Sequence, residues 1–107
     1  MSDKYILDGR TPVPVDLMTW ARWFEKGNDN CRVASTVADG IHVSTVFLGI
    51  DHSFGRGRPL LFETMIFGGK HDEWQDRCET WKEAEEMHKR ACELAGIQTT
   101  AAGGESK

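Results

Sequence analysis

Apolar residues alternate with polar ones in some stretches of this chain and recur with a helical period in others, and these patterns predict its elements. Residues 32–37 and 41–50 are rich in Val, Thr, Ile and Phe, and the Asp39-Gly40 pair between them is typical of a tight hairpin turn. A third strand is expected over residues 60–67, and because both of its alternating faces are largely apolar, it should be a central strand. Two shorter strands are expected near residues 5–7 and 74–78.

Two stretches have the i, i+3, i+4, i+7 spacing of amphipathic helices. The first helix should begin after Asp16 as N-cap and end near Lys26. The last should begin at a capping box, Thr80 with Glu83, and end at Gly96. The apolar stripe of the first helix consists of Leu17, Trp20, Ala21 and Phe24. The apolar side of the last consists of Trp81, Ala84, Met87, His88, Ala91, Cys92, Leu94 and Ala95.

These elements predict an α+β fold, in which a three- to four-stranded antiparallel β-meander has two helices packed on one face. A chain of 107 residues makes one domain with a modest core, and we place this domain at residues 1–97. Residues 98–107 contain nothing to bury and are expected to form a disordered C-terminal tail.

Charge and composition narrow the classes of function. The net charge of -4 and a pI near 5.5 argue against broad binding to nucleic acid or to an anionic membrane. No stretch approaches the roughly 18 consecutive apolar residues of a membrane span, and the N-terminus lacks the features of a signal peptide. We therefore expect a cytoplasmic protein whose three cysteines, Cys31, Cys78 and Cys92, are free thiols.

The loop between the second and third of these main strands carries the first candidate site. Asp51 and His52 lie where a strand opens into a loop, a common place for catalytic groups, and a neighbouring carboxylate can fix the tautomer of a histidine. Adjacent residues of an extended chain point in opposite directions, however, so Asp51 could instead cap the loop while His52 is solvated. Both interpretations stay open.

Two arginines follow in the run Gly55-Arg56-Gly57-Arg58-Pro59, which resembles the core of the AT-hook, a minor-groove DNA clamp. AT-hooks usually lie in disordered, basic chains, whereas this run joins two strands of an acidic protein. The same loop could cradle an anion with its backbone amides and arginines. It could also be a turn that glycine makes flexible and arginine makes soluble.

One histidine and one carboxylate stand out within the predicted core. His88 lies in the apolar stripe of the last helix, where a histidine is more often a packed, hydrogen-bonded core residue than a ligand. If the helices cover the face that carries Glu63, its carboxylate needs a partner, for which His88 or an arginine is suitable. Exposure at a strand edge is the alternative for Glu63. The cysteines show no C-x-x-C spacing, and neither a metal site nor a catalytic residue is assigned.

Beyond these local patterns, the chain resembles a group of small bacteriophage and prophage proteins of uncharacterised activity. The resemblance lies in residues 43–55, 59–69 and 80–88. The residues that match the pattern of this group are Asp51, His52, Phe54, Gly55, Pro59, Glu63, Trp81, Glu83, Ala84 and His88. The chain departs from the pattern with Met87 in place of a glycine and Cys78 in place of an aromatic residue. Arg56 and Arg58 lie outside the shared pattern.

The resemblance implies a phage accessory protein that acts in the cytoplasm of the host cell, and such proteins commonly act by binding. Our leading hypothesis is that the chain binds and occludes a host protein or protein complex, with inhibition of a defence system such as CRISPR as its sharpest form. The candidate binding residues are Asp51, His52, Phe54, Arg56, Arg58, Glu63 and His88. The alternative is a small metal- or nucleotide-binding hydrolase that uses Asp51, His52, Glu63 and His88. The leading hypothesis needs no cofactor, nucleic acid or membrane, and the protein should be a monomer or a small homo-oligomer.

Overall fold

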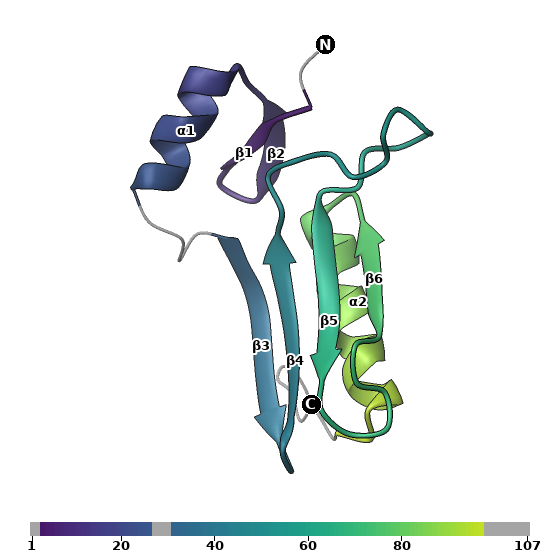
Figure 1. Cartoon of the computed structure of the whole chain (residues 1–107). Helices are drawn as coiled ribbons and strands as arrows, with labels where there is room; N and C mark the ends of the chain where they lie inside the picture. Colours follow the sequence, from purple (N-terminus) through teal and green to yellow (C-terminus); the bar gives the residue numbers. More distant parts are fainter. Residues whose placement is uncertain (1–2, 27–30, 98–107) are drawn as a thin grey trace.

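A computed structural model describes residues 3–26 and 31–97 of the chain (Figure 1). The strands are β1 (Tyr5–Asp8), β2 (Thr11–Pro14), β3 (Arg32–Ala38), β4 (Ile41–Phe47), β5 (Phe62–Phe67) and β6 (Gln75–Cys78). The helices are α1 (Leu17–Glu25) and α2 (Trp81–Leu94). The tail predicted at residues 98–107 lies outside the described residues.

Strands β3 to β6 form one antiparallel sheet in sequence order, so that β4 and β5 are its central strands. The turn between β3 and β4 has the predicted geometry. Asp39 and Gly40 have φ angles of 54° and 78°, and a type I′ turn needs positive φ at both positions. The structure confirms the predicted α+β class and the four-stranded meander, and the helices pack on the sheet. It also confirms that β5, the third strand of this meander, is a central strand.

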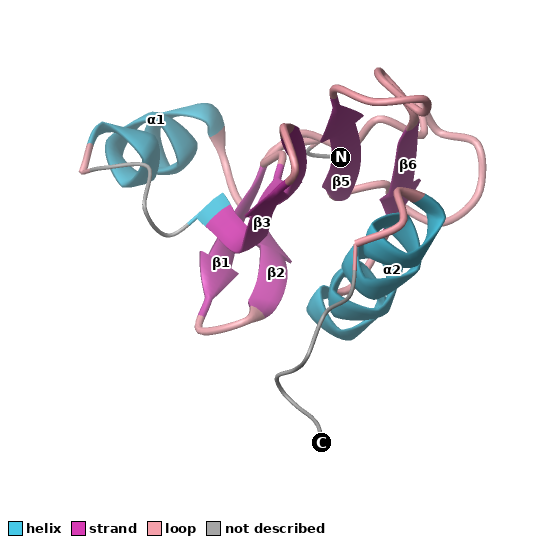
Figure 2. Cartoon of the chain, turned by 90° about the horizontal axis from the view of Figure 1, so that it is seen from below, coloured by secondary structure: helices cyan, strands magenta, loops and turns pink. Residues whose placement is uncertain are grey.

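Helix α2 covers one face of this sheet (Figure 2). The capping box is present: the Thr80 side chain accepts the Glu83 N–H, and the Glu83 carboxylate accepts the Thr80 N–H, both at 3.1 Å. The inward side of α2 packs against alternate residues of β4 and β5 because these point to the same face. Buried apolar residues of these three elements are Val43, Phe47, Phe62, Ile66, Ala84, Met87, Ala91 and Cys92.

Strands β1 and β2 form a second, two-stranded antiparallel sheet, of which the sequence predicts only β1. The sequence did not predict β2 because it contains Pro12 and Pro14, and proline has no N–H to donate to a strand ladder. The strand forms nevertheless, because a strand with a free edge tolerates proline at positions where no donor is needed. The small sheet is joined to the segment after β4. The Tyr5 N–H donates to the Gly49 carbonyl at 2.8 Å, and Lys4 forms a bridge with Ile50.

Helix α1 packs at the same junction. The Trp20 indole N–H donates to the Gly49 carbonyl at 2.9 Å. The Trp23 ring meets the Phe47 ring edge-on, with centroids 5.9 Å apart. Gly49 has a φ of 78°, and a Cβ there would collide with the ring of Phe24. Glycine at this position therefore permits the helix to approach the sheet.

The predicted helix ends agree with the structure, but two apolar positions do not. Asp16 caps α1 by accepting the Thr19 N–H at 2.8 Å, as expected. Leu17 and Leu94 were expected in the inward stripes, yet they are 58% and 41% exposed. Each lies in a terminal turn of its helix, and periodicity alone does not show where the neighbouring layer ends.

Candidate functional site

His88 is a hydrogen-bonded residue of the core. Its Nδ1 lies 2.7 Å from the Thr45 Oγ1 and its Nε2 lies 2.9 Å from the Thr36 Oγ1. The Thr45 hydroxyl in turn lies 2.5 Å from that of Thr64. Neutral imidazole has one donor and one acceptor nitrogen, which suits two hydroxyl partners. Burial, with a smaller effect from His42, lowers the pKa of His88 and favours this neutral form.

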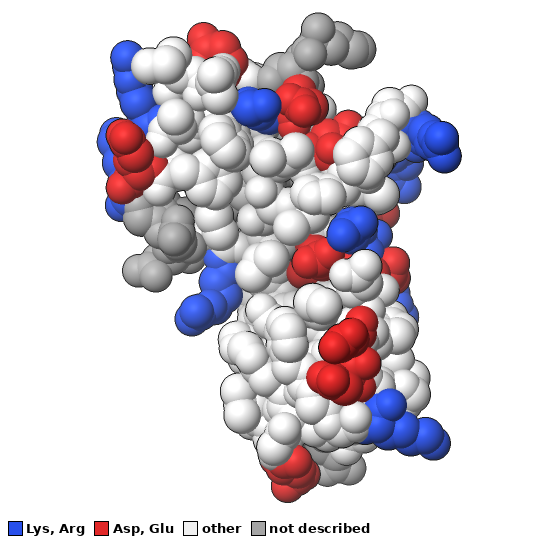
Figure 3. All heavy atoms as spheres, in the orientation of Figure 1, with Lys and Arg blue, Asp and Glu red and all other residues white. Residues whose placement is uncertain are grey.

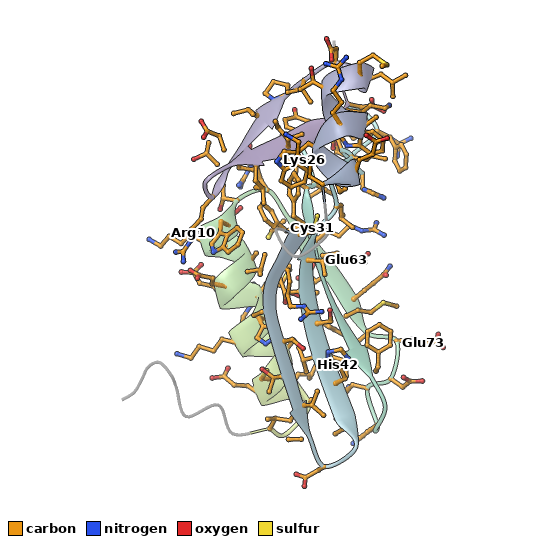
Figure 4. All side chains as sticks on the ribbon, turned by 90° about the vertical axis from the view of Figure 1, so that its left-hand side faces the viewer. Arg10, Lys26, Cys31, His42, Glu63 and Glu73 are labelled. Carbon is orange, nitrogen blue, oxygen red and sulfur yellow. The ribbon has the colours of Figure 1, made fainter. Side chains whose placement is uncertain are left out.

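Glu63 lies on the other face of the sheet from His88. Its neighbours on β5, Phe62 and Thr64, are fully buried on the side of α2, and alternate residues of a strand point in opposite directions. Figure 4 shows Glu63 on the side away from α2. The partner of Glu63 is Arg77, directly opposite on β6, whose Nε and Nη2 donate to its Oε2 at 3.0 and 2.9 Å. An arginine therefore supplies the partner that the sequence requires, and Glu63 does not meet His88.

Asp51 closes the base of the loop between β4 and β5. Its Oδ1 accepts the N–H groups of Ser53 and Leu60 at 2.8 and 3.0 Å. Although burial favours the protonated acid, these hydrogen bonds outweigh it and lower the pKa of Asp51. The His52 N–H donates to the Leu60 carbonyl at 3.0 Å, and the His52 Nδ1 lies 2.9 Å from the Ile50 carbonyl oxygen. Both side chains thus hold the loop in place.

Beyond this base the loop projects from the end of the sheet (Figure 1). Phe54 is 83% exposed, and Arg56 is exposed and makes no ion pair within the described part of the chain. Arg58 instead donates to Glu79 and to both carboxylate oxygens of Glu83, the latter at 2.9 Å. The bond from Arg58 is the main reason that the pKa of Glu83 is lowered. Arg58 therefore ties the loop to the start of α2.

The side chains of the hydrolase hypothesis do not form one site. His88 lies under α2, Glu63 lies on the opposite face, and Asp51 and His52 are bound into the loop. Within residues 3–26 and 31–97, no three His, Cys, Asp or Glu side chains are grouped so that they could hold a metal ion. No described helix is long and apolar enough to cross a membrane.

The structure instead presents a surface that the sequence did not identify, which we call the open face. It is the face of the sheet opposite α2, and no described helix lies over it along β4 and β5 (Figure 4). Its cross-strand rows are Val37–His42–Phe67, Ser35–Ser44–Met65–Gln75 and Arg32–Val46–Glu63–Arg77. Figure 3 shows broad white areas on this side of the molecule between separate red and blue groups.

Two apolar side chains of the open face are well exposed, Val37 at 70% and Phe67 at 44%. The His42 ring lies 5.8 Å from that of Phe67, and its Nε2 lies 2.9 Å from the Ser35 Oγ. The signal for this surface was present in β5, where Met65 and Phe67 form a second apolar row. Helix α2 covers only the face that carries Phe62, Thr64 and Ile66, so the second row is not covered by it.

A shallow cavity of about 340 Å³ lies between the β1–β2 turn and the start of α2. The Arg10 guanidinium lies over the Trp81 ring there, 5.2 Å from its centroid, and Lys82 is a second cation in the lining. Figure 4 shows Arg10 beside the ribbon of α2. None of the candidate residues named from the sequence lines this cavity.

Comparisons of the chain with models of protein families, with curated proteins and with solved structures give no match.

Proposed function

We propose that this chain is a small phage-type accessory protein that binds a host protein or protein complex through the open face and thereby occludes it. One observation carries the proposal: the open face exposes Val37 at 70% and Phe67 at 44% in one cross-strand row, with no described helix over β4 and β5. Exposed apolar side chains leave water when another molecule covers them, and apolar groups rimmed by polar residues are typical of interaction sites.

The composition of the open face suits a protein partner. Val37, Met65 and Phe67 supply apolar area, and the ion pair of Glu63 with Arg77 stands beside them. Protein interfaces combine an apolar centre with a polar rim and are enriched in Met, Arg and aromatic residues. A nucleic-acid surface would need an excess of basic groups, whereas this chain has a net charge of -4.

Occlusion is favoured over chemistry because the groups suited to acid–base catalysis already have structural partners. His88 is hydrogen-bonded in the core, and Asp51 and His52 hold the loop. The similarity of residues 43–55 and 59–69 to phage proteins supports a partner in the host cell. Inhibition of a defence complex such as a CRISPR effector is the sharpest form of the proposal.

Affinity capture from host lysate tests this function. The tagged protein should retain a host protein in stoichiometric amount, identified by mass spectrometry, and should inhibit that protein when both are purified. The double variant Val37→Glu/Phe67→Glu should weaken capture by about tenfold or more, because carboxylates in the centre of an interface would be desolvated without partners. Both residues are exposed, so the variant should fold.

The matched control is Leu17→Glu/Met18→Glu on α1, which adds the same charge at two apolar residues of similar exposure, 58% and 60%. It should capture the partner as the wild type does. Equal loss in both double variants would exclude a specific role for the open face. If capture is lost in a Phe54→Glu variant and in no other, the binding surface is the loop between β4 and β5 and not the open face. Recovery of the tagged protein without any host protein would contradict a binding function.

A further inference from the structure

The four-stranded sheet ends in two unlike edge strands. Strand β6 has four residues, and Asp76 and Arg77 place charges on it. Strand β3 has seven residues, and none from Val33 to Ala38 is charged or is a proline. Proteins usually protect a sheet edge by keeping it short or by placing charge or proline on it. Strand β6 has this protection, whereas on β3 only a register shift between Arg32 and Ala34 interrupts the ladder.

The outer side of β3 has no pairing partner within the described part of the chain. Its neighbour in the sheet is β4, and Figure 1 shows it as the outermost strand on the left. A row of backbone N–H and C=O groups along such an edge is a template for one more strand. Val37 near its end is 70% exposed.

The charges at the two ends of β3 are complementary to each other. Arg32 begins the strand and Asp39 follows its last residue, both are exposed, and neither makes an ion pair within residues 3–26 and 31–97. When two copies of β3 pair antiparallel about a two-fold axis, each end of one strand meets the opposite end of the other. Arg32 of each copy then lies near Asp39 of its partner, twice in the same interface.

We propose that β3 pairs antiparallel with β3 of a second copy of this chain, so that the two sheets become continuous. Residues directly opposite each other in a ladder share a face, so a residue such as Ser35 or Thr36 lies opposite its own copy and the axis passes midway between the two. The two α2 helices then lie on one side of the joined sheet and the two open faces lie side by side on the other. This dimer does not depend on the proposed host partner.

Sedimentation measurements on the full chain, from about 10 μM to about 1 mM, test the dimer. The average mass should rise with concentration from 12.0 kDa towards twice that value. Arg32→Glu or Asp39→Lys alone should weaken association by about tenfold, because each puts like charges together at both ends of the interface. The double variant Arg32→Glu/Asp39→Lys should restore association to within about threefold of the wild type.

The control variant is Arg22→Glu, which makes the same change of charge on α1 and should associate as the wild type does. Amide hydrogen exchange gives a second readout that needs no variant: the amides of β3 should become protected at high concentration, while those of β6 should not. A constant mass of one chain across the range would overturn the proposal. So would association that the single variants leave unchanged, or that the double variant fails to restore.

Discussion

The two faces of the four-stranded sheet carry alternate residues of the same strands, yet they are built on different principles. On β5, Phe62, Thr64 and Ile66 are fully buried against α2, whereas Phe67 on the other face is 44% exposed. The covered face even has its polar groups paired, since the threonines of β3, β4 and β5 bond to His88 or to each other. The open face leaves apolar and hydrogen-bonding groups in water. The covered face therefore supplies stability, and the open face is the surface through which we propose that a partner binds.

The hydrogen bonds of His88 under α2 show that a histidine in a core can have a purely structural role. Thr36 and Thr45 come from neighbouring strands and place hydroxyls on either side of the His88 ring. A buried polar group costs little when its hydrogen bonds are made, and much when they are not. His88 thus helps to fix α2 over the sheet.

The strongest test of the comparison replaces adjacent residues of β5. Ile66→Ala should lower the free energy of unfolding by about 3 kcal/mol, because it leaves a cavity in a fully buried site. Met65→Ala, one residue away on the open face, should cost about 1 kcal/mol or less but should weaken capture of the partner. Chemical denaturation measures the first effect and affinity capture the second. Similar losses of stability in the two variants would remove the distinction between the faces.

The second prediction concerns the pH dependence that the covered face imposes. Because the pKa of His88 is lowered in the folded protein, the unfolded chain binds more protons as the pH falls below the ordinary value of 6.5. The stability linked to His88 is therefore complete above that value and is lost as the pH decreases towards the lowered pKa. Denaturation at several pH values between about 8 and 5 should show this decline.

His88→Gln is the matched variant for this prediction. It should cost about 2 kcal/mol at pH 8, since it disturbs the bonds to Thr36 and Thr45, and its stability should vary less with pH over the same interval. A slope in the variant equal to that of the wild type would assign the pH dependence to other groups. The lowered pKa of Asp51 contributes only in more acidic solution, because the unfolded carboxyl titrates near 3.8.

The smallest effect on stability is expected for the ion pair of the open face. Glu63→Gln should change the free energy of unfolding by less than about 1 kcal/mol, because the Glu63 and Arg77 side chains keep 18% and 32% of their exposure. The same change should weaken partner binding measurably if the pair is desolvated in the complex. A large loss of stability with unchanged capture would show that Glu63 serves the fold and not the surface.

Local signals in the sequence were sufficient for most of the elements. The capping box of Thr80 and Glu83, the Asp39-Gly40 turn and the Asp16 cap act between residues a few positions apart, and each is found where it was predicted. Strand β2 was not predicted, because its prolines are compatible with a strand only where that strand has a free edge, and the sequence does not show the edge. The candidate site was predicted less well, because its residues were chosen one by one without knowing which face each would occupy.

The sequence by itself thus determined the α+β class, the order of the strands and the amphipathic α2, since periodicity and caps are local properties of the chain. Only the tertiary structure decided that Glu63 pairs with Arg77 and that His88 reaches Thr36, 52 residues away in the sequence. It also decided which apolar row of the strand over residues 62–67 is covered. Alternation assigns residues to two faces, but the layer that covers a face is made by a distant segment, and that contact exists only in the folded chain.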